Sequence, residues 1–166
     1  MEYTTYFGHI LCLNLAKYVP WNSIDQHRPE LLFEATRKKG ALVGIAHPFS
    51  YGDPFARGCR FEMTISDYSK VDFIEIFNNP EPLHEVNERG TNLWMSLIFS
   101  GYQITATSGM DLHNRAKLAG CYATYIEGKN GGNIASELDT AIHTHRTWVS
   151  KGALLLTEVL PETNEF

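Results

Sequence analysis

Histidine and carboxylate side chains recur at short spacings in this 166-residue chain. It carries seven histidines although its net charge is -5, and His with Asp or Glu supplies the usual ligands of catalytic metal ions. Asp111 and His113 are two residues apart, a spacing that turns both side chains to one face of an extended segment. A carboxylate can bridge two metal ions while an imidazole binds one. Short Asp-x-His pairs are also common by chance, so an ordinary loop histidine is the alternative for His113.

Other metal-competent side chains stand near the ends of predicted strands. His47 directly follows the apolar run 41–46, and His9 follows the predicted strand 3–7 just past Gly8. Glu2 stands immediately before that first strand, and Asn78 ends the strand 71–77. In folds built on parallel strands, functional groups gather where the strands end at their carboxyl side. We therefore expect Glu2, His9, His47, Asp111 and His113 to meet at one metal site.

The elements that must position these residues alternate along the chain. The apolar runs and β-branched segments predict strands, and the 3.6-residue patterns predict helices. The predicted strands are 3–7, 41–46, 71–77, 102–107, 121–126 and 147–150, and the predicted helices are 28–39, 83–100 and 134–143. This alternation favours an α/β fold, with a parallel sheet or barrel and crossover helices, in a single domain over residues 1–166.

Composition excludes several classes of protein. Hydrophobic residues make up 43% and charged residues 20% of the chain, which is typical of a globular domain. The acidic balance, without any Lys/Arg-rich run, argues against nucleic acid as a partner and against an editing exonuclease. The longest apolar runs are too short to cross a membrane. Three scattered cysteines without a Cys-x-x-Cys pair favour reduced thiols and a cytoplasmic location.

The order of the motifs resembles that of a known family. The segments concerned are Glu2-Tyr3-Thr4-Thr5 with Gly8-His9, Gly44 to Phe49, Gly52-Asp53-Pro54, Gly58 to Phe61, Val71 to Asn78, Ser108 to His113 and Arg146 to Ser150. Together they are similar to the PHP (polymerase and histidinol phosphatase) metallohydrolases, and more narrowly to the carbaryl-hydrolase branch, the CehA/McbA type. The resemblance covers nearly the whole chain.

The resemblance implies a (β/α) barrel of about seven strands with two or three metal ions, zinc, manganese or iron, at one end. Glu2 would bridge the first two ions, His9 and His47 would complete the second, Asp111 would bind the first and His113 the third. Asp111 and His113 would be the catalytic pair. The implied activity is hydrolysis by a metal-bound hydroxide, with a small phosphoester as substrate, or a related ester or carbamate.

The chain departs from this family at its start. The family begins with a His-x-His strand upstream of the Glu, and no such motif precedes Glu2. We therefore expect an incomplete PHP-type barrel that lacks its N-terminal strand or strands. Glu2, His9 and His47 would still suffice for one zinc ion with an open position. The alternative is a truncated or decayed barrel that keeps at most one ion and acts as a non-catalytic binding module. The open strand edges of an incomplete barrel predict a homo-oligomer, paired through the strand region 3–7 or through the last strand.

Several further residues leave two interpretations open. Arg60, Arg115 and Asn78 are candidate substrate contacts. The two arginines are candidates because a guanidinium can hold an anion through two hydrogen bonds. Both arginines fit solvated surface charges equally well. Cys59 could be a nucleophile, but no histidine stands at a convincing partner position, so a structural thiol is favoured. His143-Thr144-His145 has the His-x-His spacing and is interpreted as an exposed helix end.

Overall fold

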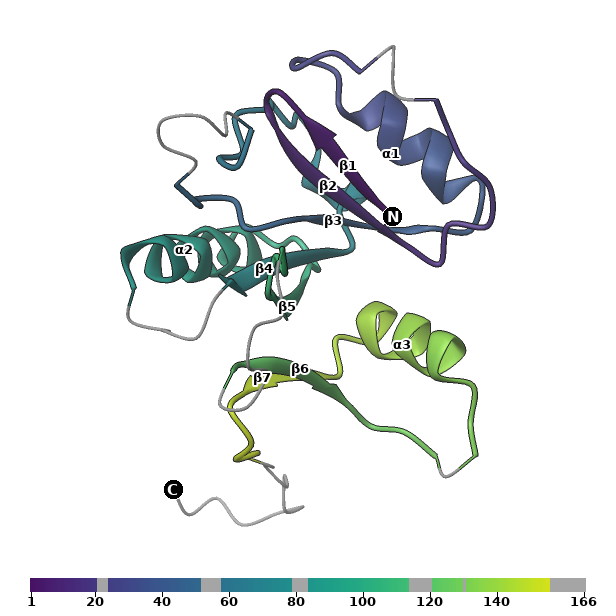
Figure 1. Ribbon diagram of the computed structural model, residues 1–166, viewed down its shortest axis with the longest axis vertical. Helices are drawn as coiled ribbons and strands as arrows, with labels where there is room; N and C mark the ends of the chain where they lie inside the picture. Colours follow the sequence, from purple (N-terminus) through teal and green to yellow (C-terminus); the bar gives the residue numbers. More distant parts are fainter. Residues whose placement is uncertain (21–23, 52–57, 79–83, 114–120, 130, 156–166) are drawn as a thin grey trace.

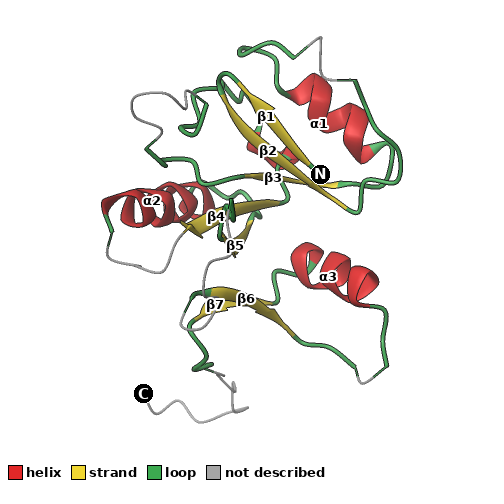
Figure 2. Cartoon of the chain, viewed as in Figure 1, coloured by secondary structure: helices red, strands yellow, loops and turns green. Residues whose placement is uncertain are grey.

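The computed structural model describes residues 1–20, 24–51, 58–78, 84–113, 121–129 and 131–155. Figure 1 traces the elements from purple to yellow, and Figure 2 separates helices from strands. In chain order they are β1 (Glu2–Thr5), β2 (Gly8–Leu13), α1 (Glu30–Arg37), β3 (Leu42–Ile45), a short 3-10 turn (Tyr68–Lys70), β4 (Phe73–Asn78), α2 (Glu85–Phe99), β5 (Thr105–Gly109), β6 (Ala123–Ile126), α3 (Ile134–His143) and β7 (Thr147–Ser150).

The strands form two sheets. The larger sheet has the order β1-β2-β3-β4-β5, in which β1, β2 and β3 pair antiparallel while β3, β4 and β5 pair parallel. The smaller sheet is the antiparallel pair β6-β7. It lies beside β5, where the Ser108 amide donates to the Thr124 hydroxyl at 2.8 Å and the Thr147 hydroxyl donates to the Ala106 carbonyl at 2.8 Å.

The predicted PHP-type (β/α) barrel is wrong. Over the described residues the five-stranded sheet is open, with β1 and β5 as its two edge strands. The physical reason lies at the start of the chain, where β1 turns directly into β2 through residues 6 and 7. The Thr5 hydroxyl accepts the Phe7 amide at 3.1 Å inside this turn. A two-residue connection can only make an antiparallel hairpin, whereas a parallel barrel needs a crossover at each step.

One face of the large sheet forms the main core. Alternate strand residues such as Ile10, Val43, Ile45 and Ile74 point to this face and are almost fully buried. Leu32 and Phe33 of α1 and Leu97 of α2 join the same cluster, so both helices cover this face. The spacing of Leu32, Phe33 and Thr36 places them on one stripe of α1, which is why that short helix docks here.

The opposite face is covered differently. Leu42 and Phe73 point to it and pack against Ile142 of α3. The Thr105 hydroxyl donates to the carbonyl of Ile142 at 2.6 Å, which fixes the end of α3 against β5. His9 and Glu75 belong to this second face by strand alternation. One end of the face is therefore apolar and packed under α3, and the other end carries polar groups.

Most predicted elements are confirmed, with shifted ends. Helix α3 and strand β7 have the predicted bounds, and β3, β4, β6, α1 and α2 lie within a residue or two of the predicted ranges. Strand β5 begins three residues later than predicted. Strand β2 was not predicted, so His9 lies inside a strand and not in a loop after one. Among the described helices, none combines the length and the apolar character that crossing a membrane requires.

Candidate metal centre

Three predicted ligands converge on the second face of the sheet. The Oε1 atom of Glu2 lies 2.7 Å from Nδ1 of His9 and 3.9 Å from Nε2 of His47. The two imidazole nitrogens are 3.2 Å apart. Glu2 comes from β1, His9 from β2, and His47 from the segment directly after β3 (Figure 1). The sequence prediction that these three residues meet is confirmed, and together they could hold a metal ion.

The spacing of the three donor atoms fits one small divalent ion. Two ligands about 2.0–2.1 Å from a tetrahedral metal ion are roughly 3.3 Å from each other. The three observed separations, 2.7, 3.2 and 3.9 Å, lie on both sides of this value. Two imidazoles and one carboxylate form a typical catalytic donor set for zinc, and a fourth position remains open in such sites. The residues present therefore fit a metal ion.

The strand register brings the donors together. In the β1-β2 hairpin Glu2 is opposite Leu11 and Thr4 is opposite His9, so Glu2 and His9 are diagonal neighbours on one face. In the β2-β3 pair the Ala46 amide donates to the carbonyl of His9 at 3.2 Å. This bond places the start of β2 against the end of β3. The antiparallel hairpin that rules out a barrel is thus the element that delivers Glu2 and His9 to His47.

His47 is held in an unusual backbone conformation. Its φ of 26° is positive, a region that costs free energy for a residue with a side chain. The Nδ1 atom of its ring lies 3.0 Å from the carbonyl of Cys59 and donates to it, which leaves the Nε2 lone pair free to face Glu2 and His9. Its backbone amide donates to Oε2 of Glu75 at 3.1 Å. Anchoring of both ring and backbone is the pattern expected for a ligating histidine.

The electrostatics of the cluster favour a metal-binding state of His9. Burial lowers the pKa of the His9 imidazole, and the neighbouring His47 lowers it further, while Glu2 acts in the opposite sense. The net direction is downward, so the unprotonated ring that can donate a lone pair is favoured. His9 and His47 are 9% and 4% exposed, whereas the Glu2 side chain is about one-third exposed. The cluster is therefore accessible from the side of β1.

Glu75 is a supporting residue that the sequence analysis did not select. Its partly buried carboxyl group accepts the His47 amide; burial raises the pKa of this carboxyl, and the hydrogen bond partly offsets the effect. Gly109 on the neighbouring strand β5 makes room for it, since a Cβ at position 109 would lie 2.0 Å from Oε1 of Glu75. A carboxylate between the apolar residues Ile74 and Ile76 of the predicted strand was the available signal.

A cavity of about 320 Å³ opens beside Glu2 and His47, two of the three ligands. Its described lining residues are Glu2, Leu11, Ala46, His47, Glu75, Asn78, Asp111, Leu112 and His113. The lining thus unites side chains from the ends of β3, β4 and β5 with Glu2 of β1. His47, Asp111 and His113, three of the five residues expected to meet, thus line one cavity, and Asn78, a predicted substrate contact, lines it with them.

Asp111 and His113 line the cavity without joining the group of three ligands. Asp111 has a positive φ of 44°, and its carbonyl lies 2.7 Å from Nδ1 of His113. That carbonyl raises the pKa of the His113 imidazole, and the charge of Asp111 adds to the effect. His113 is largely exposed at the cavity wall. Their predicted roles as metal ligands and catalytic pair stay predictions.

The remaining candidates lie elsewhere. Arg60 is exposed, forms an isolated β-bridge with Phe49, and is not among the described residues around the cavity. Arg115 lies outside the described residues. His143 and His145 are held near α3, the former against the carbonyl of Asp139 at 2.8 Å and the latter 2.8 Å from the Thr105 hydroxyl. Cys59 contributes its carbonyl, and burial raises the pKa of its thiol, as expected for a structural residue.

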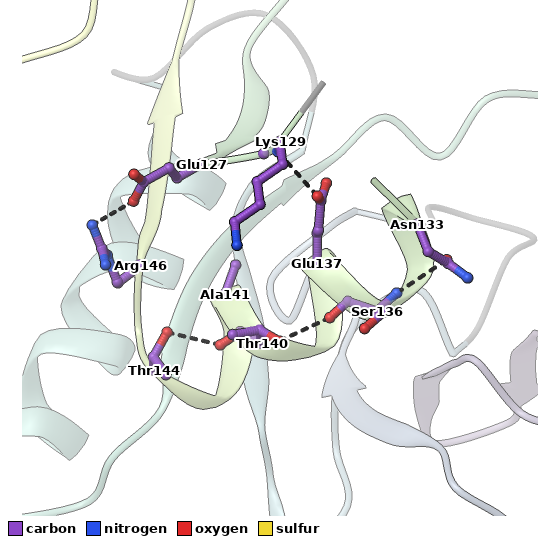
Figure 3. A pocket seen from close by; sticks show the side chains of 10 residues that line it. Glu127, Lys129, Asn133, Ser136, Glu137, Thr140, Ala141, Thr144 and Arg146 are labelled. Atoms are coloured by element: carbon purple, nitrogen blue, oxygen red, sulfur yellow. Dashed lines mark hydrogen bonds and ion pairs between the residues drawn. The ribbon is translucent and has the colours of Figure 1, made fainter. Parts of the chain in front are cut away.

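A second hollow of about 530 Å³ lies between α3 and the ends of β6 and β7 (Figure 3). An ion pair between Glu127 and Arg146 borders it, and the Glu137 carboxylate accepts the Lys129 amide at 3.0 Å. The Thr140 and Thr144 hydroxyls donate to carbonyls within α3. The polar groups bordering this hollow are thus largely engaged with one another, and the described residues around it include no group of three metal-competent donors.

Comparison with known proteins adds no family to this description. No protein-family model matches the chain, and no curated protein matches it significantly. The argument for function therefore rests on the geometry of the cluster and its cavity.

Proposed function

We propose that the chain is a metal-dependent hydrolase that binds one divalent transition-metal ion at Glu2, His9 and His47. The observation that carries the proposal is the convergence of the three donor atoms within 4.8 Å of one another. Zinc, manganese or iron suits this mixed imidazole and carboxylate donor set. The order of the sequence motifs, which resembles that of PHP metallohydrolases, supports the same activity, although the fold is not theirs.

The cavity gives this ion a place to act on a substrate. A divalent ion supplies two things to hydrolysis: it lowers the pKa of water, and it neutralises charge that develops on the substrate. The chain's own residues bind and orient the reactants. Asp111 and His113 line the same cavity as Glu2 and His47, where they would contact the reacting bond of a small phosphoester, or of a related ester or carbamate.

The experiment combines metal analysis with an activity assay. Protein freed of metal with a chelator and reloaded with zinc or manganese should retain about one equivalent per chain. It should then hydrolyse p-nitrophenyl phosphate, p-nitrophenyl acetate or an aryl carbamate. Glu2→Gln should weaken metal retention and hydrolysis together, because the amide is a poorer ligand than the carboxylate. Glu88→Gln on the exposed side of α2 is the matched control and should change neither.

One alternative has its own observation. Asp111 and His113 lie outside the group of three ligands, so the described donor set accounts for a single ion. The resemblance implies a hydrolase with two or three ions. A donor set for one ion therefore favours the alternative function, a non-catalytic metal-binding module. One bound equivalent without release of p-nitrophenol from any of the three substrates would select the binding module. Less than about one-tenth equivalent of metal would contradict both functions.

A further inference from the structure

One edge of the large sheet is open in the described part of the chain. At the other edge the β6-β7 pair lies beside β5, where the Ser108 amide and the Ala106 carbonyl are bonded to threonine hydroxyls of that pair. Strand β1 has β2 on one side and no described strand on the other. An unpaired strand edge presents a row of amides and carbonyls, and it is a template for pairing with a further strand.

The register of the β1-β2 hairpin identifies the unpaired groups. The Cys12 amide donates to the Met1 carbonyl at 2.7 Å, and the Met1 amino group donates to the Cys12 carbonyl at 2.8 Å. Bonded and non-bonded pairs alternate in an antiparallel ladder, so Tyr3 also bonds β2 while Glu2 and Thr4 face away from it. Within the described residues, the backbone amides and carbonyls of Glu2 and Thr4 therefore have no hydrogen-bond partner.

Strand β1 lacks the usual protection of a sheet edge. Natural edges are protected by lysine or proline, by a β-bulge, or by a charge that pairing would bury. Strand β1 has the sequence Glu-Tyr-Thr-Thr, and its register with β2 is uninterrupted. Its one charged side chain, Glu2, already has a partner in Nδ1 of His9 at 2.7 Å, so covering it leaves no carboxylate without a hydrogen bond. Met1 and Tyr6, which adjoin the two ends of β1, are each more than half exposed.

We propose that a second copy of this chain pairs with this edge, strand β1 against strand β1, in antiparallel orientation around a two-fold axis at Tyr3. In this register Glu2 of one copy is opposite Thr4 of the other, and each such pair exchanges both backbone hydrogen bonds. All the outward amides and carbonyls of Glu2 and Thr4 are then satisfied in both copies. The register that sets Glu2 opposite Glu2 brings two like charges together and is disfavoured. A two-fold contact uses one patch twice, which is the commonest symmetry of soluble homo-oligomers.

The contact adjoins the candidate metal centre. Glu2 belongs both to the edge strand and to the ligand group, and its side chain is about one-third exposed. Thr4 is on the same face of the sheet, opposite His9. In the dimer, Thr4 of the second copy lies beside Glu2, so the second copy covers the side from which the cluster is accessible. Because only a short strand takes part, the contact is smaller than that of an obligate dimer and is reversible.

The test is sedimentation velocity of the whole 166-residue chain as purified. From about 1 μM to about 500 μM, we expect a reversible equilibrium between monomer and dimer. Thr4→Pro removes the outward amide at an edge position, where proline is tolerated, and should weaken dimerisation at least about tenfold. Thr4→Val is the matched control: it keeps the amide and the β-branched shape, and it should dimerise like wild type.

Amide hydrogen exchange of the wild type locates the contact and does not depend on how Thr4→Pro folds. The amides of Glu2 and Thr4 should exchange more slowly in concentrated than in dilute protein. A chain that stays monomeric at the highest concentration would overturn the inference, as would a dimer in which these two amides exchange at the dilute rate. A dimer that a folded Thr4→Pro variant leaves intact would overturn it too. A dimer that retains no zinc would contradict the proposed function and support this inference, because the pairing needs no metal ion.

Discussion

Gly109→Ala tests how the metal centre is supported without altering a ligand. The added Cβ would lie 2.0 Å from Oε1, 2.4 Å from Cδ and 2.7 Å from Oε2 of Glu75. Such contacts are impossible, so the partly buried carboxyl group must move. The Glu75 carboxyl is the acceptor of the His47 amide at 3.1 Å, and His47 has a positive φ that this bond helps to hold.

Two effects set the expected size of the change. Overpacking a buried site costs about 1–3 kcal/mol of stability. Loss of a supporting hydrogen bond behind a metal ligand lowers metal affinity by about 10–100-fold. We therefore expect Gly109→Ala to melt earlier than wild type and to bind zinc at least about tenfold more weakly. The assays are thermal unfolding of the metal-free protein and zinc titration against a competing chelator.

A double-mutant cycle separates this mechanism from general damage to β5. Glu75→Ala removes the carboxyl group with which the new methyl group collides. If the collision is the cause, Gly109→Ala should cost little further stability or zinc affinity in the Glu75→Ala background, so the two changes are strongly non-additive. Additive losses, or wild-type zinc affinity in Gly109→Ala alone, would refute the reasoning.

Three further predictions concern the fold around the site. Asp72→Ala should lower the free energy of unfolding by about 1–3 kcal/mol in denaturant titration, because the buried Val43 amide, which donates to Asp72 at 2.7 Å, loses its acceptor. Asp72→Asn keeps an acceptor oxygen and should cost less, and equal losses from the two variants would argue against this bond. Burial opposes ionisation of Glu30, but bonds from the Ser66 hydroxyl and amide outweigh it and lower its pKa. The stability that Glu30 contributes is therefore present above its pKa in the unfolded state and is lost as the pH falls through its pKa in the folded state. Glu30→Gln should make the free energy of unfolding fall less steeply with decreasing pH, and an unchanged slope at acid pH would contradict this. Asn133→Ala should cost about 0.5–2 kcal/mol in thermal unfolding, because the side chain caps α3 by accepting the amides of residues 135 and 136; a loss below the error of the measurement would count against the cap.

The sequence predicted most elements whose pattern is local. The period of α3 and the apolar run of β3 depend on neighbours a few residues away, and both elements lie where they were expected. The β1-β2 hairpin was missed because its turn consists of Tyr6 and Phe7, which are not turn-forming types; Gly8, with a φ of 139°, is the only turn residue nearby. That omission left the antiparallel hairpin out of the expected topology, whereas the incorrect barrel itself was what the resemblance to PHP metallohydrolases implied.

In the candidate site too, some residues could be selected from local sequence patterns and one could not. Glu2, His9 and His47 were selected because their types are metal ligands and they stand near predicted strand ends, and the structure brings them together. Glu75 could not be selected in this way, because its role depends on partners outside its own strand. Its carboxyl group is accommodated by Gly109, and the residue it supports, His47, is 28 positions away. Local sequence patterns do not contain such pairings.

The central claim is that Glu2, His9 and His47 bind one metal ion, and X-ray absorption spectroscopy of the zinc-loaded protein tests it most directly. The account predicts a zinc ion with two imidazole ligands, the remaining ligands being oxygen, at about 2.0–2.2 Å. In the His9→Ala variant one imidazole contribution should disappear or the ion should be lost. A sulfur ligand at about 2.3 Å, which would place the ion at a cysteine, or a spectrum unchanged in His9→Ala, would contradict the claim.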